Sequence, residues 1–112
     1  VGGAIAPGPA VMTAYLADHT ALLPRIKWPV RIPPIGRSTR SAMAVGAVAG
    51  YAGLLKAVCA RLAEAIGEKH ATVILTGGFA KRLARSMGRR VRVSPRLTLE
   101  GLLRVYAINK AR

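Results

Sequence analysis

Two hydroxyl side chains, Ser38 and Thr39, follow Gly36 and open the longest apolar run of the sequence, residues 41–66. Serine and threonine at a loop-to-helix junction accept hydrogen bonds from the first unpaired N–H groups of the helix. Such hydroxyls can also hold a polar ligand, because helix starts attract anionic groups. Gly36 permits a backbone conformation that is closed to other residues. The residue types therefore predict either a helix N-cap or a small polar-ligand site, and both interpretations stay open.

A second candidate is the turn Thr76-Gly77-Gly78, which follows the β-branched run 71–75 and precedes an expected helix. Open α/β sheets bind ligands at the carboxyl ends of their strands, and two glycines would let a nucleotide approach the backbone. Gly-Gly is also an ordinary tight turn. The chain carries neither Gly-x-x-x-x-Gly-Lys-Ser/Thr nor Gly-x-Gly-x-x-Gly, so the motif alone does not establish a nucleotide site.

His19 and Thr20, at the end of an expected helix, could orient a polar substrate. A lone histidine there is more often a C-terminal cap. His19, Cys59 and His70 lack the spacing of metal ligands, and a single aspartate, Asp18, supports no Ser–His–Asp set. A phosphoryl-transfer enzyme needs carboxylates, and none of the four acidic residues lies in a glycine-rich strand-end context. We therefore predict no catalytic residue and no metal site in these 112 residues.

The charge is strongly unbalanced, with 18 Lys and Arg against 4 Asp and Glu, a net charge of +14. This balance indicates an anionic partner, or equally an arginine-rich but inert surface. The densest basic cluster is Lys81, Arg82, Arg85, Arg89, Arg90, Arg92 and Arg96. Its segment has only one aromatic residue, Phe79, for base stacking. A basic nucleic-acid-binding module therefore remains an alternative, without a stacking surface to support it.

The elements that would position these residues alternate between helix and strand. We expect a strand ending at residue 5, a helix from about 10 to 19, an irregular segment at 21–34, a helix over 41–66, a strand at 71–75, a helix at 79–87, a strand at 91–93 and a helix from Ser94-Pro95 to about Tyr106. This order predicts the α/β class. The single cysteine, Cys59, suits a reducing cytosol, and no secretory signal is evident.

The apolar run 41–66 should bury Leu54, Leu55, Val58, Leu62 and Ile66 on or near one face. Gly46 and Gly50 form Gly-x-x-x-Gly, which also occurs in membrane helix dimers. The uncharged stretch between Arg40 and Lys56 is fifteen residues, shorter than the roughly 20 that span a bilayer. We expect a buried soluble helix whose glycines admit a neighbouring helix, with no membrane partner.

Five motifs in register resemble the carboxyl-terminal half of type III pantothenate kinase, over essentially all 112 residues. They are Gly2-Gly3-Ala4-Ile5-Ala6-Pro7-Gly8, His19-Thr20-Ala21-Leu22-Leu23-Pro24, Gly36-Arg37-Ser38-Thr39, Thr76-Gly77-Gly78 and Leu97-Thr98-Leu99-Glu100-Gly101-Leu102. The resemblance implies an actin-like ATPase (ASKHA, ribonuclease H-like) fold, of which residues 1–112 would be a single partial domain. The sequence departs from the family pattern at Ser38, where asparagine is common, and at 89–96, which is unusually basic.

The resemblance also implies an activity: ATP-dependent phosphorylation of pantothenate to 4′-phosphopantothenate, the first step of coenzyme A synthesis. It implies Mg²⁺, a monovalent cation (K⁺ or NH₄⁺), a homodimer and a cytoplasmic location. Thr39 would contact pantothenate, His19 and Thr20 would reach the pantothenate site of the other subunit, and Gly77 and Gly78 would lie beside the nucleotide. The catalytic aspartate and the phosphate loop would precede Val1, so the isolated chain should be inactive. A non-catalytic regulatory relative of the kinase is a further alternative.

Overall fold

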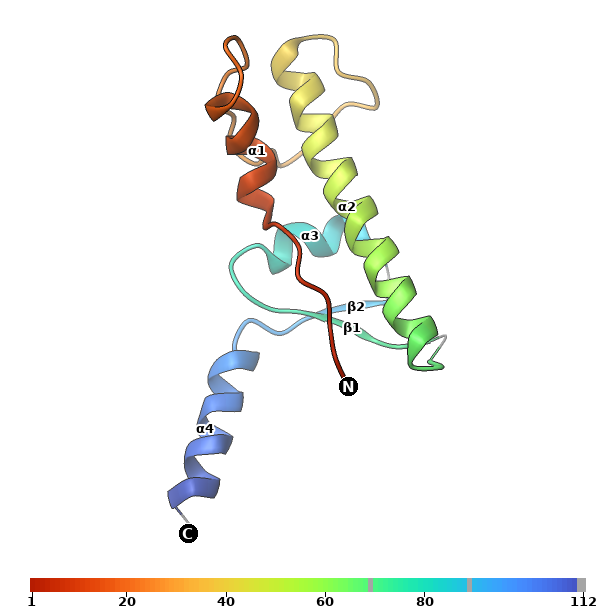
Figure 1. The fold of residues 1–112 in the computed structure, drawn as a ribbon, viewed down its shortest axis with the longest axis vertical. Helices are drawn as coiled ribbons and strands as arrows, with labels where there is room; N and C mark the ends of the chain where they lie inside the picture. The colour runs from red at the N-terminus through yellow and green to blue at the C-terminus, as the bar shows by residue number, and fades with distance from the viewer. Residues whose placement is uncertain (69, 89, 111–112) are drawn as a thin grey trace. The chain divides into compact units, whose positions relative to one another are not determined.

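The computed structural model describes residues 1–68, 70–88 and 90–110, and it divides the chain into two compact units, Val1–Ala71 and Thr72–Arg112. The first unit contains helices α1 (Pro9–Asp18) and α2 (Thr39–Ala65). The second contains strand β1 (Val73–Leu75), helix α3 (Ala80–Met87), strand β2 (Val91–Val93) and helix α4 (Leu97–Lys110). Figure 1 shows the elements in this order along the chain. The presence of both helices and strands agrees with the predicted α/β class. That residues 1–112 form a single partial domain of an actin-like fold stays a prediction.

Helix α1 begins where the sequence predicts, because Pro9 at its first position already has the φ of a helix and lacks the N–H that a helix start leaves unpaired. Gly8 precedes it in an extended conformation, and its carbonyl accepts a hydrogen bond from the N–H of Val11 at 3.0 Å. The segment before the helix differs from expectation. Residues 1–8 form no strand, and Val1 and Ile5 are fully exposed, since the one pairing between strands in the described residues joins β1 to β2.

Helix α2 packs against α1, and the two run side by side in opposite directions (Figure 1). A Cβ built on Gly50 would lie 3.8 Å from the terminal methyl carbon of Met12, so this glycine faces α1 as expected. Gly46 has no such neighbour within 4 Å. The glycine pair therefore admits the neighbouring helix at one of its two positions.

The buried face of α2 lies nearer its amino terminus than predicted, at Met43, Ala47, Tyr51 and Ala52. Leu62 and Ile66, expected in the core, are 39% and 51% exposed. Length explains the difference, because ten residues of α1 rise about 15 Å, whereas the 27 residues of α2 rise about 40 Å. One short helix cannot cover both ends of a long one. Trp28 anchors the irregular segment before α2 by an edge-to-face contact with Tyr51, 5.9 Å between ring centroids.

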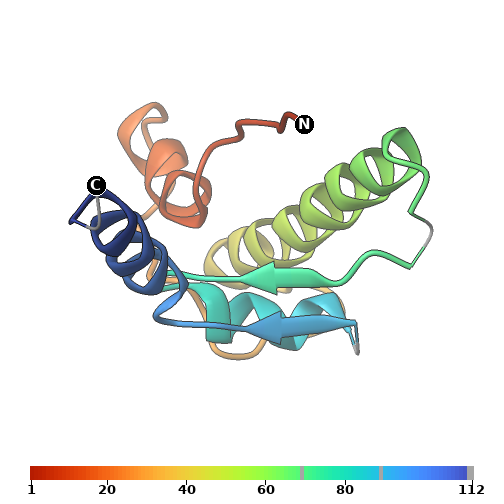
Figure 2. The ribbon, with the colours of Figure 1, turned by 90° about the horizontal axis from the view of Figure 1, so that it is seen from below.

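In the second unit, β1 and β2 pair in parallel, with Val73 opposite Val91 and Leu75 opposite Val93 (Figure 2). Helix α3 contacts both strands through its buried side chains, Ala80 and Leu83. It covers one face only, so Ile74 is 51% exposed, although the β-branched run 71–75 has the length and composition of a buried parallel strand. Helix α4 begins at Leu97, three residues later than predicted, and it buries none of its residues.

Gly36 has a role that the sequence did not indicate. Its φ lies outside the positive range, which among the described residues holds only Gly67, Gly77 and Gly88. Instead, a Cβ at Gly36 would overlap the backbone N and Cα atoms of Ala42 in the first turn of α2. The missing side chain therefore serves close packing of the loop on the helix, and the prediction of a special backbone conformation was wrong.

We expect Gly36→Ala to lower the free energy of unfolding of the chain by about 1–3 kcal/mol, because the backbone of α2 cannot move aside as a flexible side chain would. Gly46→Ala is the matched control. It meets open space within helix α2 and should raise stability by about 0.5–1 kcal/mol. Urea unfolding followed by circular dichroism measures both changes. Equal stability of Gly36→Ala and the unsubstituted chain would contradict the close packing.

Candidate functional site

Ser38 caps helix α2. Its Oγ accepts a hydrogen bond from the N–H of Ser41 at 3.2 Å, and its own N–H donates to Oγ of Ser41 at 2.9 Å. The two serines thus form a reciprocal capping box, with serine in place of the usual glutamate or glutamine at the fourth position. Ser38 is therefore the cap that the sequence predicted at this junction. Sequence reasoning missed Ser41, although the Ser-x-x-Ser spacing carries the signal.

Thr39 is the first residue of α2, its side chain is exposed, and its hydroxyl makes no hydrogen bond within the part of the chain that the structure describes. The structure thus gives the capping role to Ser38, and the ligand role of Thr39 stays a prediction. Ser38 satisfies the helix start, so Thr39 is not needed as a cap. Its hydroxyl is held at the start of a rigid helix, where it can bond to a ligand.

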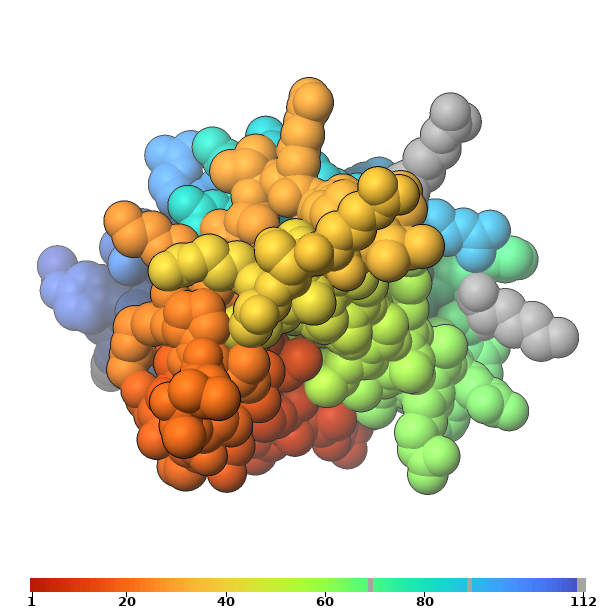
Figure 3. Space-filling view, turned by 90° about the horizontal axis from the view of Figure 1, so that it is seen from above, coloured from red at the N-terminus to blue at the C-terminus, as the bar shows by residue number. Residues whose placement is uncertain are grey.

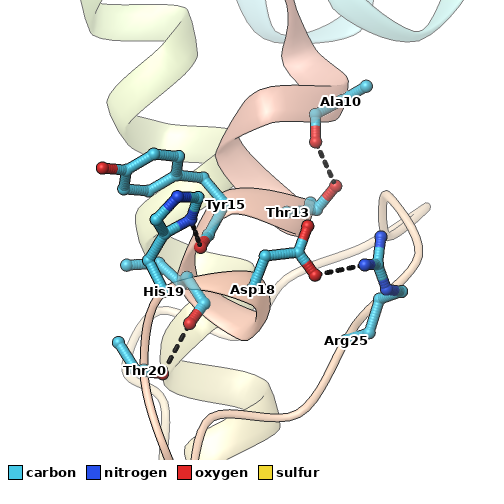
Figure 4. A network of polar contacts seen from close by, with 8 residues as sticks. Ala10, Thr13, Tyr15, Asp18, His19, Thr20 and Arg25 are labelled. Atoms are coloured by element: carbon cyan, nitrogen blue, oxygen red, sulfur yellow. Dashed lines mark hydrogen bonds and ion pairs between the residues drawn. The ribbon is translucent and has the colours of Figure 1, made fainter.

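His19 and Thr20 end helix α1 through their side chains (Figure 4). Nδ1 of His19 lies 3.0 Å from the carbonyl oxygen of Tyr15, and the hydroxyl of Thr20 donates to the carbonyl of Leu16. The His19 ring also stacks on Tyr15, with 3.9 Å between centroids and 14° between planes. Both residues therefore act as caps, as lone residues of these types at a helix end usually do.

Capping leaves one polar atom of His19 available. A carbonyl can only accept, so the hydrogen lies on Nδ1, and Nε2 points away as a potential acceptor. Nearby, Asp18 forms an ion pair with Arg25 on the surface of the same unit. Since α1 and α2 run in opposite directions, the end of α1 and the start of α2 lie at the same end of the pair (Figure 1). The structure thus brings His19, Thr20 and Thr39 to one end of the first unit.

Gly77 and Gly78 belong to the second unit, in an exposed turn directly after β1. Gly77 has φ of +87°, which a residue with a side chain rarely adopts, and its carbonyl accepts a hydrogen bond from the N–H of Ala80 at 3.2 Å. An added Cβ at Gly78 would meet nothing within 4 Å. The backbone at this strand end is therefore exposed, and nucleotide binding at Gly77 and Gly78 stays a prediction.

The basic cluster is divided between two faces of the second unit. Lys81, Arg82 and Arg85 lie on α3 and are exposed, with the guanidinium carbon of Arg82 5.7 Å from the centroid of the Phe79 ring. Arg92 lies opposite Ile74 on the sheet face that α3 does not cover, and Arg89 lies outside the described residues. The four described residues Lys81, Arg82, Arg85 and Arg92 therefore do not lie on one shared face, which gives the nucleic-acid alternative no support.

Two further properties of the chain bear on metal ions and membranes. Within residues 1–68, 70–88 and 90–110, no group of three or more His, Cys, Asp or Glu side chains could hold a metal ion.

Helix α2 is long and apolar enough to cross a membrane by length and composition, with a mean hydropathy of 1.6 in its most apolar window. Its length therefore does not exclude a membrane, contrary to the sequence expectation. Core helices of soluble proteins share these properties, and the absence of a membrane partner stays a prediction.

Comparison with known proteins identifies the family. A family model described as type III pantothenate kinase matches residues 1–61, more than half of the chain. The chain belongs to the type III pantothenate kinase family. Three relatives named type III pantothenate kinase illustrate the similarity. The chain is 47% identical to that of Akkermansia muciniphila over 111 residues, 39% identical to that of Dehalococcoides mccartyi strain CBDB1 over 110, and 42% identical to that of Thermus thermophilus over 106.

These alignments cover 97%, 98% and 95% of this chain, but 45%, 41% and 41% of the three relatives. The chain thus spans less than half the length of the curated relatives it matches. The family that the sequence motifs predicted is confirmed.

The assignment of the cap to Ser38 and not to Thr39 can be tested by the stability of two variants. Ser38→Ala should lower the free energy of unfolding by about 1 kcal/mol, because the N–H of Ser41 loses its acceptor. Thr39→Val keeps the shape of the side chain and removes a hydroxyl that bonds to nothing among the described residues, so we expect a change within about 0.5 kcal/mol. Urea unfolding of the two variants gives the comparison. A larger loss for Thr39→Val than for Ser38→Ala would make Thr39 the cap after all.

Proposed function

We propose that this chain supplies part of a kinase that transfers a phosphoryl group from ATP to pantothenate, giving 4′-phosphopantothenate for coenzyme A synthesis. The observation that carries the proposal is the 47% identity to a type III pantothenate kinase over nearly the whole chain. The chain would form one part of an actin-like ATPase fold, with its two described units contributing to the substrate side and the nucleotide side of the enzyme.

On the substrate side, the proposal gives Thr39 a hydrogen bond to pantothenate. Support comes from the capping box, which satisfies the start of α2 through Ser38 and Ser41 and leaves the Thr39 hydroxyl exposed and unbonded among the described residues. His19 and Thr20 would contribute to the pantothenate site of a partner subunit in a homodimer. Nε2 of His19 is the atom suited to this role, because Nδ1 is engaged with the carbonyl of Tyr15.

On the nucleotide side, Gly77 and Gly78 would lie against ATP. Their exposed backbone and the positive φ of Gly77 favour close approach by a ligand at the carboxyl end of β1. None of the carboxylates of this chain is placed as a general base for the attacking hydroxyl. Glu64 lies in α2, Glu68 just after it and Glu100 in α4, so none of these carboxylates follows a strand. We therefore assign no catalytic residue to this chain.

The proposed enzyme would use Mg²⁺ and a monovalent cation, K⁺ or NH₄⁺. The described residues contain no group of three or more His, Cys, Asp or Glu side chains that could hold a metal ion. We assign no ligand for these ions to this chain and derive no step from them. The enzyme would work in the cytoplasm, without a membrane or a specific nucleic acid as partner.

The activity can be tested in a hybrid enzyme in which this chain replaces the matching segment of the Akkermansia muciniphila relative. We expect the hybrid to form phosphopantothenate from ATP and pantothenate, and the 112-residue chain alone to form none, because it lacks a positioned carboxylate. A coupled assay for ADP, with a no-protein control, gives both rates. An inactive but folded hybrid would favour a non-catalytic relative, and activity of the isolated chain would refute the assignment of catalysis to other residues.

In the same hybrid, Thr39→Val should lower kcat/KM for pantothenate by about 10- to 100-fold, because a lost hydrogen bond that strands a polar group of the ligand costs roughly 1–3 kcal/mol. The KM for ATP should stay nearly unchanged. Thr39→Ser is the control, since it keeps the hydroxyl and should keep most of the activity. Unchanged pantothenate kinetics in a folded Thr39→Val hybrid would remove Thr39 from the substrate site.

A further inference from the structure

A small hollow lies in the loop that leads into helix α2. Its volume is about 330 Å³, and it is lined by Pro33, Pro34, Ile35 and Arg37. Small-molecule sites have volumes of roughly 300–1,000 Å³, so the hollow can hold part of a small ligand. The loop before α2, orange to yellow in Figure 3, lies on the face of the molecule shown there.

The walls of the hollow are held in place before any ligand arrives. Pro33 and Pro34 have fixed φ angles, which removes two of the torsions through which the loop could collapse. At the other end of the loop, Gly36 is seated against the backbone of Ala42, where even a methyl group would overlap. The capping box at Ser38 then fixes the junction to α2. A preformed site of this kind loses little conformational entropy on binding.

The lining combines three apolar side chains with one cation. Arg37 is exposed and has no carboxylate partner within the described residues. The residue two positions later is Thr39, whose hydroxyl is also unbonded among them. A guanidinium beside an apolar wall fits a ligand that ends in a carboxylate next to methylene groups.

A second hollow in the same unit has the opposite character. It measures about 370 Å³ and is lined by Ala60, Ala63, Glu64 and Gly67. Its charged side chain is an acid, which would repel a carboxylate ligand. Similar size therefore does not make the two hollows equivalent, and charge selects the one at Arg37 for an anionic small molecule.

We propose that Arg37 binds the carboxylate of the substrate, while the adjoining methylene groups pack against Pro34 and Ile35. This inference rests on the proposed function, which makes pantothenate, a carboxylic acid, the substrate. It assigns a role to Arg37, which lies in the motif Gly36-Arg37-Ser38-Thr39 but received no function from the sequence. Arginine can donate two parallel hydrogen bonds to a carboxylate, whereas a neutral hydroxymethyl group offers no charge to pair with the guanidinium.

The test compares two ligands that differ only at this end, pantothenate and pantothenyl alcohol. Their Kd values for the hybrid enzyme are measured by isothermal titration calorimetry, which does not depend on turnover. The unsubstituted hybrid should bind pantothenate about 10- to 100-fold more tightly, the range expected for a hydrogen-bonded charged pair. Arg37→Gln should remove this preference by weakening pantothenate alone, and Arg37→Lys should keep part of it.

Arg31→Gln is the matched control, because Arg31 is an exposed arginine of the same loop that does not line the hollow. It should leave both Kd values unchanged. A preference that survives in Arg37→Gln, or that is lost equally in Arg31→Gln, would overturn the role of Arg37. Equal binding of the two ligands by the unsubstituted hybrid would overturn it as well. In each of these cases phosphorylation of pantothenate by the hybrid would still support the proposed function, so the two failures are distinguishable.

Discussion

The close packing of Gly36 on the first turn of α2 is the contact on which the candidate substrate site depends. A side chain at this position would push the loop away from the backbone of Ala42. The positions of Arg37 in the loop and Thr39 in the helix would then no longer be fixed relative to each other. Because backbone packs on backbone here, the geometry does not depend on the rotamer of any flexible side chain.

Helix capping divides the polar groups of the first unit into those that hold the fold and those that can act on a ligand. At the start of α2, Ser38 and Ser41 satisfy each other and the backbone, so the hydroxyl of Thr39 is not needed for stability. At the end of α1, His19 and Thr20 are both engaged with carbonyl groups. Only the second ring nitrogen of His19 then stays available. The same residue types thus differ in capacity for chemistry because of where their hydrogen bonds go.

The second unit positions its open turn by a different device. Two three-residue strands pair in parallel, and α3 packs on one face through Ala80 and Leu83. Since the strands are short, the chain turns immediately after β1, and the glycines of the turn lie exposed at the carboxyl edge. The positive φ of Gly77 makes this turn compatible with few other residues. Lys81, Arg82 and Arg85 lie on α3, which packs on one face of the strand pair, whereas Arg92 lies on the other face.

The sequence by itself determined the local structure and the family. Pro9 set the start of α1, the β-branched runs gave β1 and β2, and Ser38 marked the cap of α2, because each depends on residues within a few positions along the chain.

Tertiary structure decided what depends on neighbours distant in sequence. The length of α1 decided which residues of α2 are buried, and the absence of a pairing partner among the described residues left 1–8 without a strand. Close contact with the backbone of Ala42 requires a residue without a side chain at position 36. The hollow at Arg37 forms only when the loop folds against the helix. Periodicity and spacing report the conformation of a segment, whereas burial and close approach are fixed by which segment packs on it.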